Sequence, residues 1–251
     1  MSKPNIKIIG VIPARLESTR FPEKPLVKIA GREMILWVAD AASKAVNLSK
    51  VIVATDSDRI FDVVKKAGFD CEMTSKFCRS GSDRLCEVAA KTDGGIYVNI
   101  QGDEPLIDPL LIDSVTKPFL NDPDISVTTA VTAIKDESEF KNPDCVKAVL
   151  DKKNFAMYFS RSPVPYFRSQ KPQFENVYKH IGIYAYTRNA LLDFANLSKS
   201  ICEEAESLEQ LRFLENGYRI YCIKTQYVNK GVDTPKDLEE VLKILKDKQG
   251  V

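Results

Sequence analysis

Basic and hydroxyl side chains gather in one short segment near the start of the chain. Residues 15–26 contain Arg15, Ser18, Arg20 and Lys24, together with prolines that predict a loop without a helix. Cations offset phosphate charge and hydroxyls donate hydrogen bonds, so this set suits a polyphosphate. The segment has neither the Walker A pattern nor G-x-G-x-x-G. By residue type alone, an exposed basic loop is an equal alternative, because the chain holds 36 Lys and Arg residues.

Two aspartates stand where a divalent cation could bind. Asp103 follows the apolar run 96–100 in the string Gln-Gly-Asp-Glu-Pro, and Asp233 stands in the string Gly-Val-Asp-Thr-Pro before a charged helical pattern. The chain has one histidine, His180, and six cysteines without metal-binding spacing. We therefore expect any metal to be hard and held by carboxylates, as Mg²⁺ is. The alternatives are a turn residue for Asp103 and a helix N-cap for Asp233.

Strands and helices alternate through the first half of the chain, and these elements must position the polar segments. Apolar runs typical of buried strands occupy residues 8–12, 51–54 and 96–100, and helical patterns occupy residues 31–45, 60–67, 85–91 and 106–120. This alternation with short links predicts an α/β fold with a doubly wound, mostly parallel, Rossmann-like sheet. Loops that follow parallel strands share one edge of the sheet, where ligands bind. We expect the basic loop and Asp103 to lie at that edge.

The pattern changes from residue 145 onward. Strand-like runs at residues 146–150, 155–159 and 181–186 follow one another without a long helix between them. Parallel pairing needs a crossover of about a dozen residues, so we expect a mixed or antiparallel excursion over residues 145–200. Further predicted elements are strands at residues 125–134 and 219–224 and helices at residues 190–195, 203–215 and 236–246. We treat residues 1–251 as a single domain that carries this excursion.

Composition narrows the class of protein. The formal net charge of +1 gives no reason to expect nucleic acid or an anionic membrane as a partner. No run is as long as a membrane span, and residues 1–5 are too short and polar for a signal peptide. We therefore expect a cytoplasmic protein, with cysteines that are buried thiols.

The order of these motifs resembles one family of enzymes. Residues 13–26, with Pro-Ala-Arg, Ser-Thr-Arg-Phe-Pro and Lys-Pro-Leu, resemble the nucleotide-binding loop of the sugar-activating cytidylyltransferases, and most closely the 3-deoxy-manno-octulosonate (Kdo) cytidylyltransferase family. Further similar strings follow in the family's order: Ser80–Arg84, Gln101–Pro105, Tyr158–Arg161, Lys179–Tyr184, Leu208–Arg212 and Gly231–Pro235. Ser82 replaces the family's usual Thr, and Lys236 replaces its usual Glu. The ordered set is far more specific than any one string.

The resemblance implies an activity and assigns residues to it. It implies transfer of CMP from CTP to Kdo, with release of diphosphate, for lipopolysaccharide synthesis, and it implies Mg²⁺ as cofactor. The implied catalytic residues are Arg15, Lys24, Asp103 and Asp233, and the two aspartates bind the metal. The implied nucleotide-binding residues are Ala14, Arg15, Ser18, Arg20, Lys24, Ser80, Gly81, Arg84 and Gln101. The implied sugar-binding residues are Gln101, Arg161, His180, Tyr184, Glu209 and Gln210, and the excursion is expected to form a homodimer interface.

Several of these roles have a plain structural alternative. Ser80 could cap a helix, Arg161 could form a surface ion pair and His180 could be structural. Residues 209–210 could lie on a solvated helix face. Two other functions also stay open: CMP transfer to a related acid sugar, such as the 8-amino analogue of Kdo, and a catalytically silent nucleotide-binding regulator.

Overall fold

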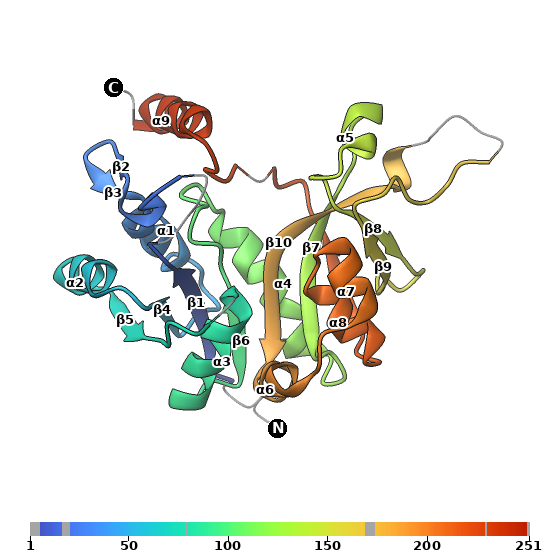
Figure 1. Cartoon of the computed structure of the whole chain (residues 1–251), viewed down its shortest axis with the longest axis horizontal. Coiled ribbons are helices and arrows are strands. Elements are labelled where there is room, and N and C mark those ends of the chain that lie inside the picture. The colour runs from blue at the N-terminus through green and yellow to red at the C-terminus, as the bar shows by residue number, and fades with distance from the viewer. Residues whose placement is uncertain (1–5, 17–20, 79, 169–173, 229, 250–251) are drawn as a thin grey trace. The chain divides into compact units, whose positions relative to one another are not determined.

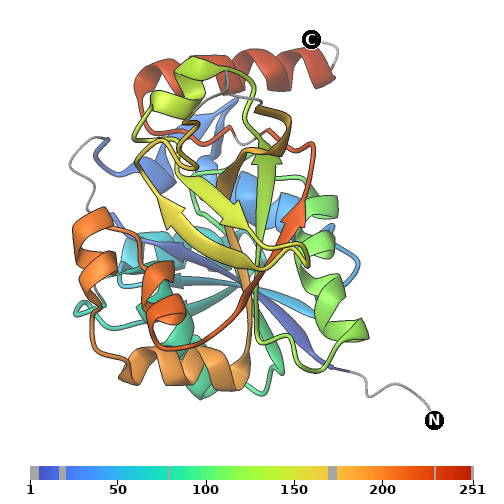
Figure 2. The same ribbon diagram turned by 90° about the vertical axis from the view of Figure 1, so that its right-hand side faces the viewer.

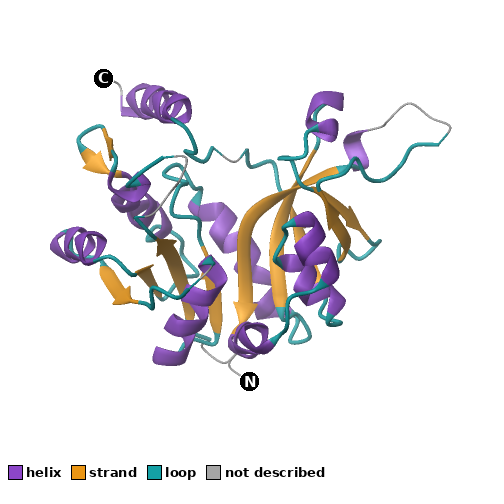
Figure 3. Ribbon diagram, in the orientation of Figure 1, coloured by secondary structure: helices purple, strands orange, loops and turns teal. Residues whose placement is uncertain are grey.

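Figure 1 shows the computed structural model of the chain, which describes residues 6–16, 21–78, 80–168, 174–228 and 230–249. The chain forms two compact units: residues 1–113 and 229–251 make up the first, and residues 114–228 make up the second. Both units contain strands and helices (Figure 3). No helix within the described ranges is long and apolar enough to cross a membrane. The expected excursion at residues 145–200 falls within the second unit, and the single-domain organisation stays a prediction.

The first unit is built on parallel strands in the order β6 (Ile96–Asn99), β1 (Ile8–Ala14), β4 (Lys50–Thr55) and β5 (Asp70–Met73). Strand β1 pairs with β4 on one side and with β6 on the other, and nearly all of its side chains are buried. This arrangement confirms the parallel sheet predicted from the apolar runs. The sequence does not predict β5, because Cys71 is its only buried residue and the strand therefore lacks an apolar run.

Helices complete the first unit: α1 (Met34–Ala42), α2 (Asp58–Lys66), α3 (Gly81–Lys91) and α9 (Pro235–Gln249), with α4 (Pro109–Asn121) beginning in it. Two predictions for this unit are wrong. A 3-10 helix, Lys24–Leu26, forms in the expected loop, because Pro25 lies in its first turn, where a missing N–H does no harm. The helix expected from residue 31 begins at Met34. It starts late because Gly31, with φ of 81°, closes a hairpin. That hairpin consists of β2 (Lys28–Ile29) and β3 (Arg32–Glu33).

An apolar cluster fixes α9 and the loop before it within the first unit. Val232 and Val241 pack with Ile29 and Met34, and all four side chains are buried. Burial of each such aliphatic side chain stabilises the fold by ~1.5–3 kcal/mol. Because Val232 directly precedes Asp233, the cluster also holds this predicted metal ligand in place.

The second unit contains a mixed sheet (Figure 2). Its strands lie in the order β11 (Ile220–Lys224), β7 (Val127–Ala133), β10 (Tyr178–Thr187), β8 (Lys147–Leu150) and β9 (Ala156–Ser160). Strand β11 runs parallel to β7, whereas β7, β10, β8 and β9 pair in antiparallel fashion. The mixed or antiparallel character expected of the excursion is confirmed.

The second unit also contains the helices α5 (Glu137–Lys141), α6 (Arg188–Asn196), α7 (Ile201–Glu206) and α8 (Gln210–Glu215) and the 3-10 helix Phe174–Asn176. The single helix predicted at residues 203–215 is wrong. Ser207 adopts a left-handed conformation with φ of 51° and ends α7, so α8 starts anew at Gln210. A serine gives no sequence signal for this break, because glycine is the residue that usually occupies the left-handed region.

Candidate active site

Three side chains from distant parts of the sequence meet in the first unit. The ammonium nitrogen of Lys24 lies 2.6 Å from Oδ2 of Asp103 and 3.0 Å from Oδ1 of Asp233. Lys24 belongs to the 3-10 helix, Asp103 to the turn after β6, and Asp233 to the loop before α9. The structure thus brings together the predicted phosphate-binding lysine and both predicted metal ligands.

Close backbone packing fixes the two aspartates relative to each other. The N–H of Val232 donates to the carbonyl oxygen of Asp103 at 2.9 Å. A Cβ atom on Gly102 would lie 2.8 Å from the carbonyl oxygen of Pro13, so the turn that carries Asp103 approaches β1 more closely than any side chain allows. The glycine before Asp103 therefore sets the position of this carboxylate.

The helix-cap alternative for Asp233 is wrong. Thr234 caps α9: its hydroxyl oxygen accepts the N–H of Asp237 at 3.3 Å, and the Asp237 carboxylate accepts the N–H of Thr234 at 2.7 Å. Burial raises the pKa of Asp237, but hydrogen bonds from Thr234 and the backbone outweigh it and hold that pKa below its ordinary value. The carboxylate of Asp233 bonds to Lys24 instead of capping the helix.

Two negative charges share one positive charge at this site. Burial lowers the pKa of Lys24, but the charges of Asp103 and Asp233 and the hydrogen bonds to them outweigh burial, so this pKa lies above its ordinary value. Carboxylates that share an ammonium also suit a hard divalent cation, because their oxygens converge. Within the described part of the chain, no group of three or more His, Cys, Asp or Glu side chains converges on a metal position. Mg²⁺ held by this pair would complete its six-oxygen shell with phosphate and water oxygens.

Other predicted nucleotide ligands stand at the end of β1 and in the turn after β6. Ala14 is the last residue of β1, and the exposed Arg15 follows it. Gln101 stands in the turn that also carries Asp103. The predicted ligands Ser18 and Arg20 lie outside the described residues.

Asn99, the last residue of β6, is a candidate that sequence reasoning missed. Its side-chain oxygen is buried and has no hydrogen-bond partner among the residues that the structure describes. A buried polar atom without a partner at the carboxyl end of a parallel strand is typical of a ligand site. The sequence signal that could have identified Asn99 is its polar side chain within the apolar run 96–100.

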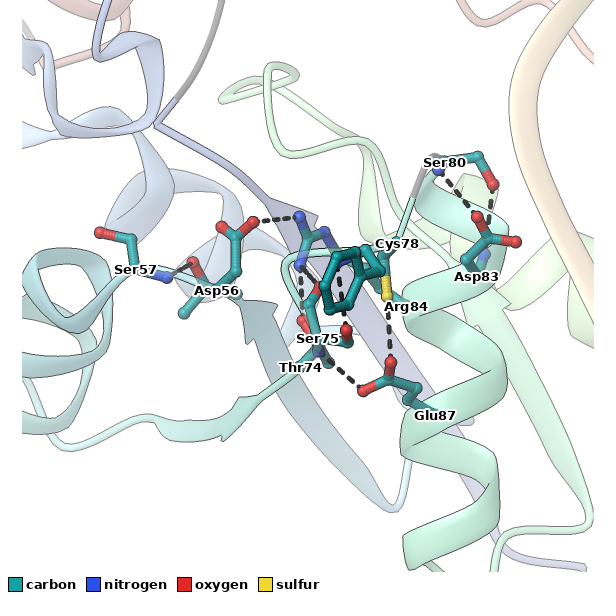
Figure 4. A network of polar contacts seen from close by, with 11 residues as sticks. Asp56, Ser57, Thr74, Ser75, Cys78, Ser80, Asp83, Arg84 and Glu87 are labelled. Atoms are coloured by element: carbon teal, nitrogen blue, oxygen red, sulfur yellow. Dashed lines mark hydrogen bonds and ion pairs between the residues drawn. The ribbon is translucent and has the colours of Figure 1, made fainter.

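Helix α3 begins with a capping box. The Ser80 hydroxyl accepts the N–H of Asp83 at 3.2 Å, and the Asp83 carboxylate accepts the N–H of Ser80 at 3.1 Å (Figure 4). A Cβ atom on Gly81 would lie 3.1 Å from Cγ of Pro13, so the start of α3 packs closely on β1. The capping alternative for Ser80 is therefore confirmed, and nucleotide contact through Ser80 and Gly81 stays a prediction.

Arg84 supports the loop before α3. The residue is only 3% exposed, and its guanidinium donates to Asp56 at 2.8 Å and to Thr74 at 2.6 Å (Figure 4). Glu87, on the same helix, accepts the N–H of Ser75 at 2.9 Å. These contacts join α3 to the segments that follow β4 and β5. The structure thus gives Arg84 a positioning role, and its contact with the nucleotide stays a prediction.

In the second unit, Arg161 follows β9, and neutral acceptors hold its guanidinium. Nε donates to the carbonyl oxygen of Glu206 at 2.7 Å, and Nη1 donates to the carbonyl oxygen of Pro143 at 3.0 Å. The guanidinium forms no ion pair with any carboxylate of the described ranges. The ion-pair alternative is therefore wrong, and the positive charge is available to an anionic ligand.

His180 lies in β10 among aromatic side chains. Its Nε2 is 2.9 Å from the hydroxyl oxygen of Thr129, and its ring lies 5.3 Å from that of Phe159 and 5.1 Å from that of Tyr184, centroid to centroid. Burial in this setting lowers the pKa of His180 to about 3, so the ring is neutral at pH 7. These contacts support the structural alternative for His180, and its contact with a sugar stays a prediction.

Two predicted sugar ligands carry unpaired polar atoms. The Tyr184 hydroxyl and the Gln210 amide nitrogen are buried and find no hydrogen-bond partner within the described residues. Each such atom costs ~1–3 kcal/mol when it is left unpaired, so its presence favours a polar ligand. Glu209 directly precedes Gln210 at the start of α8. The solvated-face alternative is wrong for Gln210, because this side chain is buried.

Comparison with known proteins identifies relatives over nearly the whole chain. The sequence profile of the family described as cytidylyltransferase matches residues 9–220. The 3-deoxy-manno-octulosonate cytidylyltransferase of Geotalea uraniireducens is 48% identical to this chain, over 96% of this chain and 100% of the relative. The enzyme of the same name from Desulfosudis oleivorans is also 48% identical, over 94% of this chain and 96% of the relative.

Solved structures agree with these sequence relatives. A CMP:2-keto-3-deoxy-manno-octonic acid synthetase complexed with CTP matches with a TM-score of 0.92 and 40% identity, over 96% of this chain and 99% of that chain. A 4-diphosphocytidyl-2C-methyl-D-erythritol synthase from Anaerococcus prevotii matches with a TM-score of 0.64 at 15% identity, over 97% of this chain and 98% of that one. The second likeness shows a shared fold alone, and both confirm the nucleotidyltransferase-like α/β class.

Proposed function

The chain belongs to the family of 3-deoxy-manno-octulosonate cytidylyltransferases, and we propose that it transfers CMP from CTP to Kdo and releases diphosphate. The observation that carries this proposal is the meeting of Lys24, Asp103 and Asp233 at one point of the first unit. These are the positions at which the family motifs imply phosphate and metal binding. The intact group argues against a catalytically silent regulator.

The chemistry is an in-line transfer of a nucleotidyl group. The anomeric hydroxyl of Kdo attacks the α-phosphorus of CTP, a new P–O bond forms, and the bond to diphosphate breaks. Such transfer depends on positioning and charge neutralisation, without a covalent intermediate on the protein. Lys24 and Arg15 are the residues that we assign to the phosphates. Ser18 and Arg20 are assigned to assist them.

Asp103 and Asp233 are assigned to Mg²⁺. When bound, Mg²⁺ supplies charge neutralisation at the α-phosphate and lowers the pKa of the attacking hydroxyl. Lys24 competes with a divalent cation for the same two carboxylates, because its ammonium already bonds to both of them. Loss of that contact frees the ammonium to pair with a phosphate oxygen.

The second unit is assigned to the acid sugar. Kdo carries one carboxylate, and the Arg161 guanidinium, whose partners among the described residues are carbonyl oxygens, suits a bidentate pair with it. The unpaired atoms of Tyr184 and Gln210 suit sugar hydroxyls. We also propose that the protein is a homodimer and that it is cytoplasmic. Light scattering of the protein as it elutes from a size-exclusion column gives its mass and so tests the dimer.

Release of diphosphate tests the assignment. The purified protein is incubated with Mg²⁺ and with CTP, UTP, ATP or GTP, each with Kdo, its 8-amino analogue or other acid sugars. We expect CTP with Kdo to give the highest turnover. We expect CTP to exceed UTP strongly, because a site that pairs the cytosine amino group rejects an analogue without it. Equal turnover with UTP would contradict the nucleotide assignment, and a preference for the amino analogue would move the assignment to that sugar.

A further inference from the structure

Lys147 is a fully buried lysine whose ammonium bonds to two carbonyl oxygens. It begins β8 in the second unit and is 0% exposed. Its ammonium donates to the carbonyl oxygens of Asn142 at 2.8 Å and of Arg161 at 2.6 Å, and it forms no ion pair with any residue of the described ranges. Burial of an ammonium without a paired carboxylate is costly, and an apolar side chain could fill the same space. The position therefore calls for an explanation beyond packing.

Both acceptors of Lys147 belong to the support of Arg161. One is the carbonyl of Arg161 itself. The other is the carbonyl of Asn142, and the next residue, Pro143, supplies the carbonyl that holds Nη1 of Arg161 at 3.0 Å. Lys147 therefore ties the turn before β8 to the end of β9 and fixes two of the segments that orient the guanidinium.

Glu206, at the end of α7, completes this support. Its carboxylate accepts the Ser160 hydroxyl at 2.6 Å and the backbone N–H of Arg161 at 2.8 Å, and its carbonyl oxygen accepts Nε of Arg161 at 2.7 Å. The carboxylate thus bonds to a hydroxyl and a backbone group, and to neither cationic side chain. Lys147, Arg161 and Glu206 together leave one net positive charge.

The electrostatics of Lys147 agree with this arrangement. Burial lowers its pKa, the charge of Arg161 lowers it further, and Cys145 and Glu206 act in the opposite direction without cancelling the shift. The charge of Arg161 therefore acts against that of Lys147, although it is the smallest of these effects. An anionic ligand on the guanidinium would relieve that repulsion.

We propose that Lys147 is a positioning residue for the site of the sugar carboxylate, an inference that rests on the proposed function. Its ammonium bonds to the carbonyl oxygens of Asn142 and Arg161, and so fixes the two segments that carry Pro143 and the Arg161 guanidinium. It also adds a second positive charge to this group of residues. Lys147 acts through Arg161, because a side chain with no exposed surface does not touch the sugar.

Replacement Lys147→Met tests the proposal, because methionine fills a similar space without a charge or a donor. We expect KM for Kdo to rise at least about tenfold, equivalent to ~1.4 kcal/mol. We expect KM for CTP to stay within about twofold, because the lost interaction concerns the sugar alone. Lys153→Met removes the same charge from an exposed turn of the second unit and should leave both constants unchanged.

A double substitution asks whether Lys147 acts through Arg161. In an Arg161→Ala background, Lys147→Met should add little to the loss of sugar binding, because residues of one network are not additive. A full additional tenfold rise in KM for Kdo in that background would overturn the positioning role.

Three further outcomes test the positioning role of Lys147. An unchanged KM for Kdo in folded Lys147→Met would overturn the proposal, as would equal rises in KM for Kdo and for CTP. If Lys147→Met does not fold, Lys147→Gln keeps two donors without the charge and should show the same split. Failure of both variants to fold, measured by circular dichroism, would overturn the proposal by showing that the lysine supports the whole sheet.

Failure of the proposed function would be distinguishable from failure of this proposal. A wild-type protein that binds Kdo in calorimetry but does not turn it over would count against the proposed function, and the Kdo affinity of the variants would still test Lys147.

Discussion

Lys24 and Lys147 are two largely buried lysines in opposite electrostatic settings. Lys24, in the first unit, bonds to two carboxylates, whereas Lys147, in the second unit, bonds to two carbonyl oxygens. Burial lowers both pKa values, but the carboxylates raise that of Lys24 above its ordinary value, and that of Lys147 stays lowered. The net charge around each lysine therefore differs in sign, and so does the ligand that each group suits. An excess of carboxylates suits a metal ion, and an excess of cations suits the carboxylate of a substrate.

The largest effect is expected at the carboxylates around Lys24. Asp103→Asn and Asp233→Asn keep size and shape but each remove a charge, so the protein should fold while kcat falls at least about a hundredfold, since groups at a developing charge typically contribute ~10²–10³. The double variant should be little worse than the worse single variant, because residues that act as a unit are not additive. Steady-state diphosphate release at saturating Mg²⁺ is the measurement.

Asp237→Asn is the matched control for Asp233. Asp237 belongs to the capping box of α9, so its replacement should lower the free energy of unfolding by ~0.5–2 kcal/mol and change kcat less than about tenfold. Near wild-type turnover in Asp233→Asn would leave Asp103 as the only supported metal ligand.

The next largest effect is expected at Arg161, whose carbonyl oxygen bonds to Lys147 in the second unit. Arg161→Ala should raise KM for Kdo by about 10- to 100-fold, the range expected for lost hydrogen bonds to a charged group, and should change KM for CTP far less. Initial rates with one substrate varied and the other saturating separate the two constants. An unchanged KM for Kdo would remove Arg161 from the sugar site and with it the contrast between the two lysines.

A metal-binding measurement without nucleotide sharpens the comparison further. Lys24→Met leaves two carboxylates without their ammonium, so Mn²⁺ should bind at least about tenfold more tightly, because a competing charge within ~4 Å is gone. Lys147→Met should leave Mn²⁺ affinity unchanged, because the Lys147 ammonium bonds to no carboxylate of the described residues. Electron paramagnetic resonance of free Mn²⁺ gives both affinities. Equal affinity in wild type and Lys24→Met would show that the lysine and the metal do not compete.

A pH dependence is expected in the second unit, where it concerns stability and not catalysis. The pKa of His180 in the folded chain is lowered to about 3, and its ordinary value is about 6.5. Between these values the unfolded chain binds more protons, so the free energy of unfolding should fall as pH falls below about 6.5. His180→Gln should weaken this dependence, as measured by urea unfolding at several pH values. A variant with the wild-type slope would show that His180 is not the group responsible.

Sequence patterns predicted the sheet of the first unit because buried parallel strands form apolar runs, as β1, β4 and β6 do. They failed where backbone conformation departs from residue preference. The hairpin before α1 and the break at Ser207 both depend on residues in the left-handed conformation. At the break this residue is a serine, so no glycine marks it in the sequence.

The sequence predicted the residues of the candidate site and placed the basic loop and Asp103 at one edge of the sheet, but it did not predict the bonds within the site. The bonds from Lys24 to Asp103 and Asp233 join residues 79 and 209 positions apart, and such contacts follow only from the folded chain. Arg84 and Lys147 carry no signal of their buried roles, because arginine and lysine are mostly exposed in proteins.

Phosphorus NMR of the wild-type protein with CTP, Kdo and Mg²⁺ shows whether the protein joins CMP to Kdo and consumes CTP. The predicted result is that diphosphate and one new phosphodiester signal rise in equal amounts as CTP disappears, and that neither forms without Kdo. Diphosphate without the phosphodiester, or loss of CTP that does not depend on Kdo, would contradict the proposed function.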